Sequence, residues 1–189
     1  MQFTLSASTE KSNLENQLLH GARKLIDKKN YLAISVNELL ATSKVSKKRF
    51  YQYYKNQIDL LHSLNSTFVT KLDTHIPSVE SKEDLATLTD NLIKITSTKE
   101  NQDKMKLLFQ MNQKIELNHF VPLKAQILTL LNEKMAVFFK KIQAKTDSLD
   151  VEELKEAFYK IMEDSIVSQN IRNFHLMVYS LKVLNVVFD

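Results

Sequence analysis

The stretch SVNELLATSKVSKKRFYQYYKNQIDLLHSL, residues 35–64, decides the fold of this chain. Ser35 and Glu38 have the spacing of a capping box, in which the serine and glutamate side chains bond each other's backbone N–H, so a helix is predicted over 36–43. The residues SKVS at 43–46 predict a tight turn, with Val45 buried beneath it. Ser46 is then the expected cap of a second helix.

This second helix is predicted to be short, over 47–53, and both basic and aromatic. Phe50 and Tyr54 are four residues apart, so they are expected to face the core together. No acidic residue lies between Glu38 and Asp59. The same interval holds five basic residues, Lys44, Lys47, Lys48, Arg49 and Lys55. A helix, a turn and a second helix with a basic outer side are typical of a helix-turn-helix, whose second helix enters a DNA major groove.

The composition predicts an all-α fold. Hydrophobic residues make up 43% of the 189 residues, enough for a buried core, but one Gly and two Pro are too few for the turns of a sheet protein. After a loose tail over 1–12, about nine helices are expected. Their predicted ranges are 13–28, 36–43, 47–53, 56–75, 82–97, 101–117, 121–145, 151–168 and 171–188. Pro77 is expected to close the fourth helix, Ser81 to cap the fifth and Pro122 to lie in the first turn of the seventh.

The positive charge is concentrated in the N-terminal third. Residues 1–60 carry a net charge of +5, whereas residues 61–189 carry −1. A local basic field of this kind favours an anionic partner. The alternative is a solvated lysine-rich surface without a partner.

Residues 35–64 resemble the helix-turn-helix of the TetR family of bacterial transcriptional repressors. The residues that carry the resemblance are Ser35-Val36, Leu39-Leu40-Ala41, Val45-Ser46, Phe50-Tyr51, Tyr53-Tyr54-Lys55-Asn56 and Leu60-Leu61. The chain departs from the family pattern where Lys44 and Lys48 replace glycines and Gln57 replaces a phosphate-binding lysine. The resemblance implies two domains, a helix-turn-helix DNA-binding domain over 1–56 and a helical effector-binding and dimerisation domain over 57–189.

The resemblance also implies which residues bind DNA. Tyr51 and Tyr53 would contact phosphates, and Lys47, Lys48 and Gln52 would approach base edges. Ser35 and Asn37 would lie at the start of the supporting helix. The set is completed by Ser46, Arg49, Lys55 and Gln57.

In the family, the later helices form a ligand pocket and a dimer interface. Residues 171–188 are apolar on nearly all sides, which favours burial against both a core and a second subunit. The expected dimer residues are Phe158, Met162, Ile166, Phe174, Val178 and Leu181. The expected pocket residues are Phe68, Met105, Leu108, Phe109, Met111, Phe120, Met135, Phe138 and Phe139; the alternative for each is a plain core position.

The sequence therefore predicts a cytoplasmic, homodimeric DNA-binding regulator that represses transcription from a pseudo-palindromic operator until a small-molecule effector releases it. No cysteine is present and the five histidines are scattered, so no metal site, cofactor or catalytic constellation is expected, and the chain is not predicted to be an enzyme. No membrane span or secretory signal is expected. The alternative function is a helical sensor or adaptor that acts through a protein partner without sequence-specific DNA binding.

Overall fold

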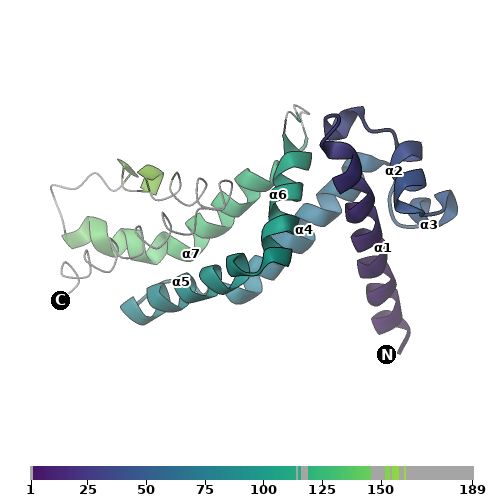
Figure 1. Ribbon diagram of the computed structural model, residues 1–189. Coiled ribbons are helices and arrows are strands. Elements are labelled where there is room, and N and C mark those ends of the chain that lie inside the picture. Colours follow the sequence, from purple (N-terminus) through teal and green to yellow (C-terminus); the bar gives the residue numbers. More distant parts are fainter. Residues whose placement is uncertain are drawn as a thin grey trace. The chain divides into compact units, whose positions relative to one another are not determined.

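The computed structural model describes residues 2–113, 115, 119–145, 152–153, 155–157 and 160, and these residues are helical or in turns, without a strand. The all-α prediction is confirmed. The helices are α1 (Gln2–Ile26), η1 (Tyr31–Ala33, a 3-10 turn), α2 (Val36–Ser43), α3 (Lys47–Tyr51), α4 (Gln57–His75), α5 (Lys82–Ser97), α6 (Lys99–Asn112) and α7 (Leu123–Lys145) (Figure 1). No described helix is long and apolar enough to cross a membrane.

By its internal contacts the chain divides into two compact units. Unit 1 consists of Met1–Phe68 and Leu107–Pro122, and unit 2 of Val69–Lys106 and Leu123–Asp189. Helices α4 and α6 therefore contribute residues to both units. The predicted functional boundary after residue 56 stays a prediction.

Helix α1 begins much earlier than the sequence suggested. The expected loose tail over 1–12 is wrong, since α1 starts at Gln2. Residues 2–12 contain no Gly or Pro that would break a helix, and Lys11 pairs with Glu15 one turn later at 3.9 Å. The apolar pattern starts only at Leu14, and residues 8–13 are exposed or half-buried, so periodicity alone could not locate the true start.

The caps of α2, α5 and α4 explain where these helices begin. The Ser35 hydroxyl accepts the Glu38 N–H, and the Glu38 carboxylate accepts the Ser35 N–H, so the predicted capping box is present. Ser81 and Asp84 form a second capping box at α5. At α4, the Asn56 side chain accepts two backbone N–H groups at 2.9 Å.

The predicted bounds of α6 and α7 shift. Helix α6 covers Lys99–Asn112 rather than 101–117. Pro122 immediately precedes α7 instead of lying in its first turn, and α4 ends at His75, ahead of Pro77 as expected. The helical residues between 152 and 160 fall within the range predicted for the eighth helix, and the helix predicted over 171–188 lies outside the described residues.

Unit 2 has its own buried core, and polar contacts link its segments. Leu85, Leu88 and Leu92 of α5 and Met135 and Phe139 of α7 are buried. Two contacts join α7 to the preceding segments. In the connection between α4 and α5, the buried Val79 donates its N–H to the Lys134 carbonyl at 2.8 Å, and the Lys134 ammonium pairs with Asp73 of α4 at 2.6 Å.

Candidate nucleic-acid interface

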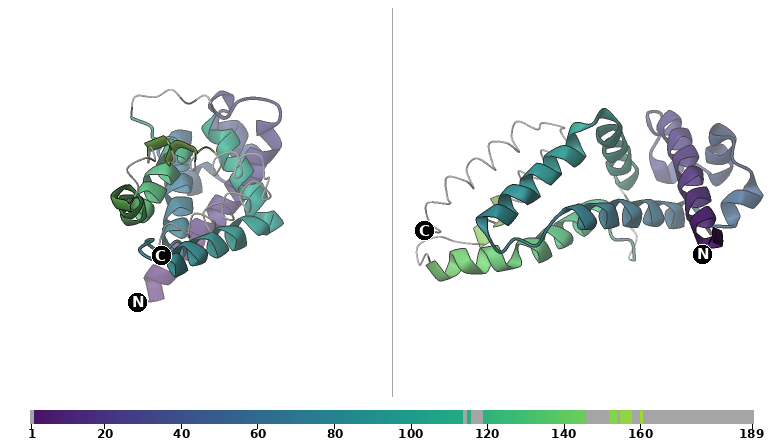
Figure 2. Two further views of the ribbon diagram at one scale, coloured as in Figure 1. Left: turned by 90° about the vertical axis from the view of Figure 1, so that its left-hand side faces the viewer. Right: turned by 90° about the horizontal axis from the view of Figure 1, so that it is seen from below.

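Helices α2 and α3 form the predicted helix–turn–helix, and α1 supports it. Gly21 of α1 meets Ser43 of α2 so closely that a Cβ on Gly21 would lie 2.7 Å from the Ser43 Cβ. The only glycine of the chain thus lies where another side chain would not fit. Figure 2 shows α2 and α3 beside α1 in two further views.

The inner side of the α3 region is apolar and tightly held. Phe50 is fully buried, and Tyr54 and Val45 are 2% and 6% exposed, so the predicted core positions are confirmed. The rings of Phe50 and Tyr54 lie 5.6 Å apart. Helix α3 is shorter than predicted, ending at Tyr51, but turn hydrogen bonds from the N–H groups of Tyr53 and Tyr54 to the Phe50 carbonyl continue its direction.

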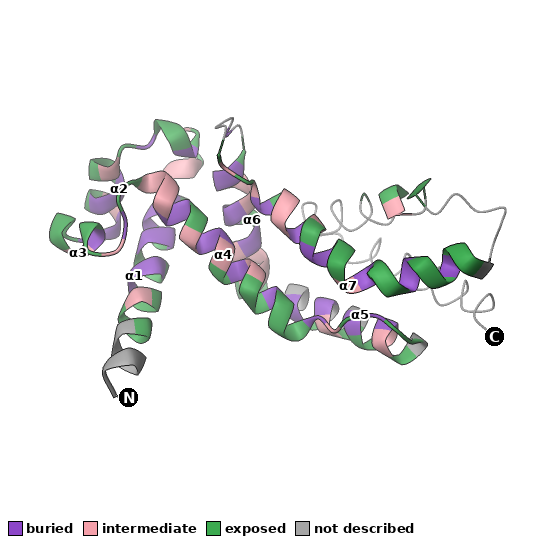
Figure 3. Cartoon of the chain, turned by 180° about the vertical axis from the view of Figure 1, so that it is seen from behind, coloured by how far each residue is buried: buried purple, intermediate pink, exposed green. Residues whose placement is uncertain are grey.

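The outer side of α3 is polar, basic and accessible. Lys47, Lys48 and Gln52 are exposed, and Tyr51 is 55% exposed despite its aromatic ring. The Tyr51 ring stands edge-on to Phe50, with centroids 5.2 Å apart and planes at 88°, so the buried ring fixes the exposed one. Figure 3 shows this alternation of buried and exposed residues along α3.

Several other predicted residues already have roles within the fold. Ser35 and Ser46 accept the capping N–H groups of α2 and α3. The Arg49 guanidinium donates to Gln17 of α1 at 2.9 Å, and the Gln57 amide donates to the Leu32 carbonyl at 3.3 Å. These side chains orient the unit as well as facing its surface.

The remaining predicted residues, Asn37, Lys55 and Tyr53, differ in their exposure to solvent. Asn37 and Lys55 are exposed. Tyr53 is half-buried, with its ring 6.3 Å from that of Tyr54. The structure therefore gathers the predicted DNA-binding residues between the cap of α2 and the first turn of α4, with the freest side chains on α3.

The acidic residues that border this surface are engaged elsewhere. The Lys29 ammonium bonds the Glu38 carboxylate, and with the Ser35 contacts this lowers the pKa of Glu38 to about 2. The Asp59 carboxylate accepts the Lys55 N–H at 2.9 Å. Among the described residues, the two carboxylates that border this surface therefore have partners of their own, Glu38 a lysine ammonium and Asp59 a backbone N–H.

A buried carboxylate beneath the surface was not anticipated. Glu15 of α1 is 6% exposed and accepts hydrogen bonds from the Tyr54 hydroxyl at 2.9 Å and the Ser63 hydroxyl at 3.0 Å. Lys11 lies 3.9 Å from the same oxygen and 6.0 Å from the centre of the Tyr54 ring. Burial, followed by the nearby Glu15 charge, raises the pKa of Tyr54, so the phenol remains a donor. The sequence offered one weak signal: Glu15 lies three and four residues before the apolar Leu18 and Leu19, on the same face of the helix.

Known structures share this architecture. The crystal structure of the regulatory protein TetR from Rhodobacter sphaeroides matches 87% of this chain and 95% of its own, with 19% sequence identity and a TM-score of 0.55. The fold resembles that of a TetR regulator. No protein-family model and no curated protein sequence matches the chain.

The residues expected to line an effector pocket are mostly buried, but they belong to different units. Phe68, Leu108 and Met111 lie in unit 1, whereas Met105, Met135, Phe138 and Phe139 lie in unit 2. Phe109 and Phe120, both in unit 1, are half-buried. Whether any of them binds a ligand stays a prediction.

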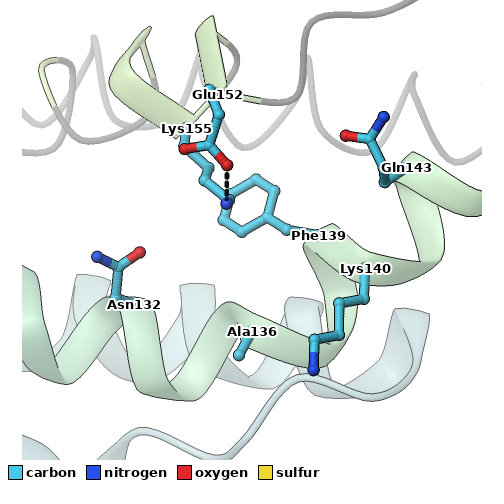
Figure 4. Close-up of a pocket in the computed structure, with 7 residues that line it drawn as sticks. All are labelled: Asn132, Ala136, Phe139, Lys140, Gln143, Glu152 and Lys155. Carbon is cyan, nitrogen blue, oxygen red and sulfur yellow. Dashed lines mark hydrogen bonds and ion pairs between the residues drawn. The ribbon is translucent and has the colours of Figure 1, made fainter.

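Unit 2 contains a pocket of about 340 Å³. It is lined by α7 and by Glu152 and Lys155, and Figure 4 shows these two side chains near Phe139. The Lys155 ammonium pairs with Glu152 and lies 5.7 Å from the centre of the Phe139 ring. Phe139 is the one predicted pocket residue in this lining.

The predicted dimer interface lies outside the described residues, and the described residues contain no candidate metal site. The expected dimer residues Phe158, Met162, Ile166, Phe174, Val178 and Leu181 lie outside the described residues. Among the described residues, no three His, Asp or Glu side chains gather as a metal site requires.

Proposed function

We propose that this protein is a DNA-binding transcriptional regulator in which α3 enters the major groove. The observation that carries the proposal is the division of the α3 region into two sides. Phe50 and Tyr54 anchor the inner side, while Lys47, Lys48, Tyr51 and Gln52 are exposed on the outer side. A major groove about 12 Å wide admits one helix, and lysine, glutamine and tyrosine donors suit phosphates and base edges.

The finer proposal concerns assembly and regulation. Two copies would pair through the C-terminal helices and place their α3 helices in successive major grooves of a pseudo-palindromic operator, about 34–36 Å apart. The protein would repress transcription in the cytoplasm, and a small-molecule effector bound in the helical body would favour a state with lower operator affinity. Support comes from the TetR-like fold and the apolar sequence of residues 171–188.

A fluorescence anisotropy titration against the DNA upstream of the protein's own gene tests DNA binding. Binding should weaken as salt rises, because phosphate contacts release counterions, and Lys47→Ala with Lys48→Ala should reduce the affinity for this DNA. Lys99→Ala with Lys106→Ala removes the same charge from exposed positions of α6 and serves as the control.

Two results would contradict the proposal. One is DNA affinity no greater than that of a generic basic protein, which would favour the sensor or adaptor function. The other is an equal loss of binding in the α3 variant and the α6 control. Light scattering of the free and DNA-bound protein tests dimerisation separately, with two chains expected per operator.

A further inference from the structure

The turn between α2 and α3 contains an unusual backbone conformation. Lys44 has φ 57° and ψ 33°, and among the described residues it is the one non-glycine residue with a positive φ. This left-handed region is disfavoured for residues with a Cβ and is mostly occupied by glycine or asparagine. A lysine here requires a reason beyond the turn itself.

The turn needs the conformation but not the lysine side chain. The Val45 N–H reaches back to the Leu40 carbonyl at 3.1 Å, which closes the end of α2, and both side chains are buried. This closing pattern depends on a left-handed residue between them. Glycine would supply it without steric cost, so the side chain contributes nothing to closing the helix.

The Lys44 side chain is exposed and uncommitted. Within the described part of the chain its ammonium has no hydrogen-bond or ion-pair partner. Its Cα lies two residues from Ser46, hence within about 8 Å of the Ser46 Cα. Three exposed lysines, Lys44, Lys47 and Lys48, therefore lie within five residues of the chain, and their combined positive charge attracts an anion to this place.

We propose that Lys44 binds a DNA backbone phosphate beside the groove that α3 enters, which rests on the proposed function. The positive φ of Lys44 fits this role, because strained backbone conformations cluster at functional positions. A phosphate contact positions the protein without reading sequence. The loss on removing it should therefore be the same for operator and unrelated DNA.

An alternative role for the Lys44 charge is to stabilise the C-terminus of α2. Helix α2 has no basic residue in its last turn, and a cation near a helix C-terminus stabilises the helix dipole. In that role, removing the Lys44 charge lowers stability and leaves DNA binding unchanged.

The test compares Lys44→Gly, Lys44→Asn and Lys44→Arg with the parent by urea unfolding and by anisotropy across a salt series. Glycine and asparagine tolerate the left-handed turn, and arginine keeps the charge. For Lys44→Gly and Lys44→Asn we expect an unfolding midpoint at or above that of the parent. Their DNA dissociation constant should rise about five- to tenfold near 0.1 M salt. The slope of log K against log salt should be smaller in magnitude by about 0.9, and both changes should be the same on operator and random DNA. Lys44→Arg should bind as the parent does.

The results separate the two proposals. If Lys44→Gly binds with the parent's affinity and slope, whatever its midpoint, the Lys44 contact is overturned, while a loss in the Lys47→Ala, Lys48→Ala protein still supports the proposed function. A loss confined to operator DNA also overturns the phosphate contact. A parent protein without salt-dependent DNA binding overturns both.

Discussion

The Tyr54 hydroxyl donates a 2.9 Å hydrogen bond to the Glu15 carboxylate, joining the segment after α3 to the supporting helix α1. Ser63 of α4 donates to the same oxygen at 3.0 Å. Helix α1, the segment after α3 and helix α4 therefore meet at one buried carboxylate beneath the proposed DNA-binding surface, and Glu15 is 39 and 48 residues from its two donors.

Removing the Tyr54 hydroxyl should destabilise the protein. Tyr54→Phe keeps the ring against Phe50 but leaves a buried carboxylate with one donor fewer, which costs about 1–3 kcal/mol of unfolding free energy. Urea unfolding followed by circular dichroism measures this cost. Tyr51→Phe removes an exposed hydroxyl and serves as the matched control, with little change expected. Equal effects of the two substitutions would show that the hydrogen bond to Glu15 contributes nothing.

Stability should also fall at alkaline pH. Burial raises the pKa of Tyr31, whose hydroxyl donates to the Gln57 carbonyl, and burial with Glu15 raises that of Tyr54. A raised folded-state pKa means that the folded protein favours the neutral phenol. This contribution is complete below the unfolded tyrosine pKa of about 10 and is lost as pH rises above it.

The double variant Tyr31→Phe with Tyr54→Phe isolates this effect. Its unfolding free energy, measured between pH 9 and about 11.5, should decline less steeply than that of the parent. Lysine deprotonation affects both proteins equally, so the difference between the two curves reports on the tyrosines. Parallel curves would contradict the assignment.

The local features of the fold could be predicted from the sequence, and the reasons are physical. The caps at Ser35, Ser46 and Ser81 depend on residues three positions apart, and the burial of Phe50 and Tyr54 depends on one helical turn. Such interactions are encoded within a few residues.

The polar interior could not be predicted in this way. Glu15 pairs with partners 39 and 48 residues away, and Asn65 with one 47 residues away. A charged residue is expected to be exposed unless a partner is known, and these partners are brought close only by the packing of α1, α4 and α6. The predicted DNA contacts could not be derived from local sequence either. The exposure of Lys47 and Tyr51 makes these side chains available, but it does not identify what they bind.

Substituting the single glycine should destabilise the protein. Gly→Ala in an exposed helix normally stabilises by up to about 1 kcal/mol. At Gly21 the new Cβ would lie 2.7 Å from the Ser43 Cβ and 3.0 Å from the Ser43 backbone, so α1 and α2 would have to separate. We expect Gly21→Ala to lower the unfolding free energy by about 1–3 kcal/mol, as overpacking does elsewhere. Ser12→Ala, on an exposed position of α1, is the control, and a stabilised Gly21→Ala protein would refute the close approach.

A buried amide pair joins α4 to α6 within unit 1. The Asn65 amide donates to the Asn112 oxygen at 2.9 Å, Asn112 returns a bond at 3.0 Å, and Asn112 also donates to the Leu108 carbonyl at 2.7 Å. Asn65 is fully buried and Asn112 is 9% exposed. Truncating either residue removes the hydrogen bonds that the other amide makes across the pair.

A double-mutant cycle measures this coupling. Asn65→Ala and Asn112→Ala should each cost about 1–3 kcal/mol, and the double variant should cost less than their sum because no orphaned amide remains. Asn65→Leu with Asn112→Leu replaces both amides by apolar groups of similar size and should recover much of the loss. Additive single effects would show that the two amides act independently.

The amide pair should also matter for DNA binding, because it joins α4 to α6 within unit 1. The same variants should weaken DNA binding in proportion to their loss of coupling. Thr67→Ala, at an exposed position of α4, should change neither the stability nor the DNA affinity.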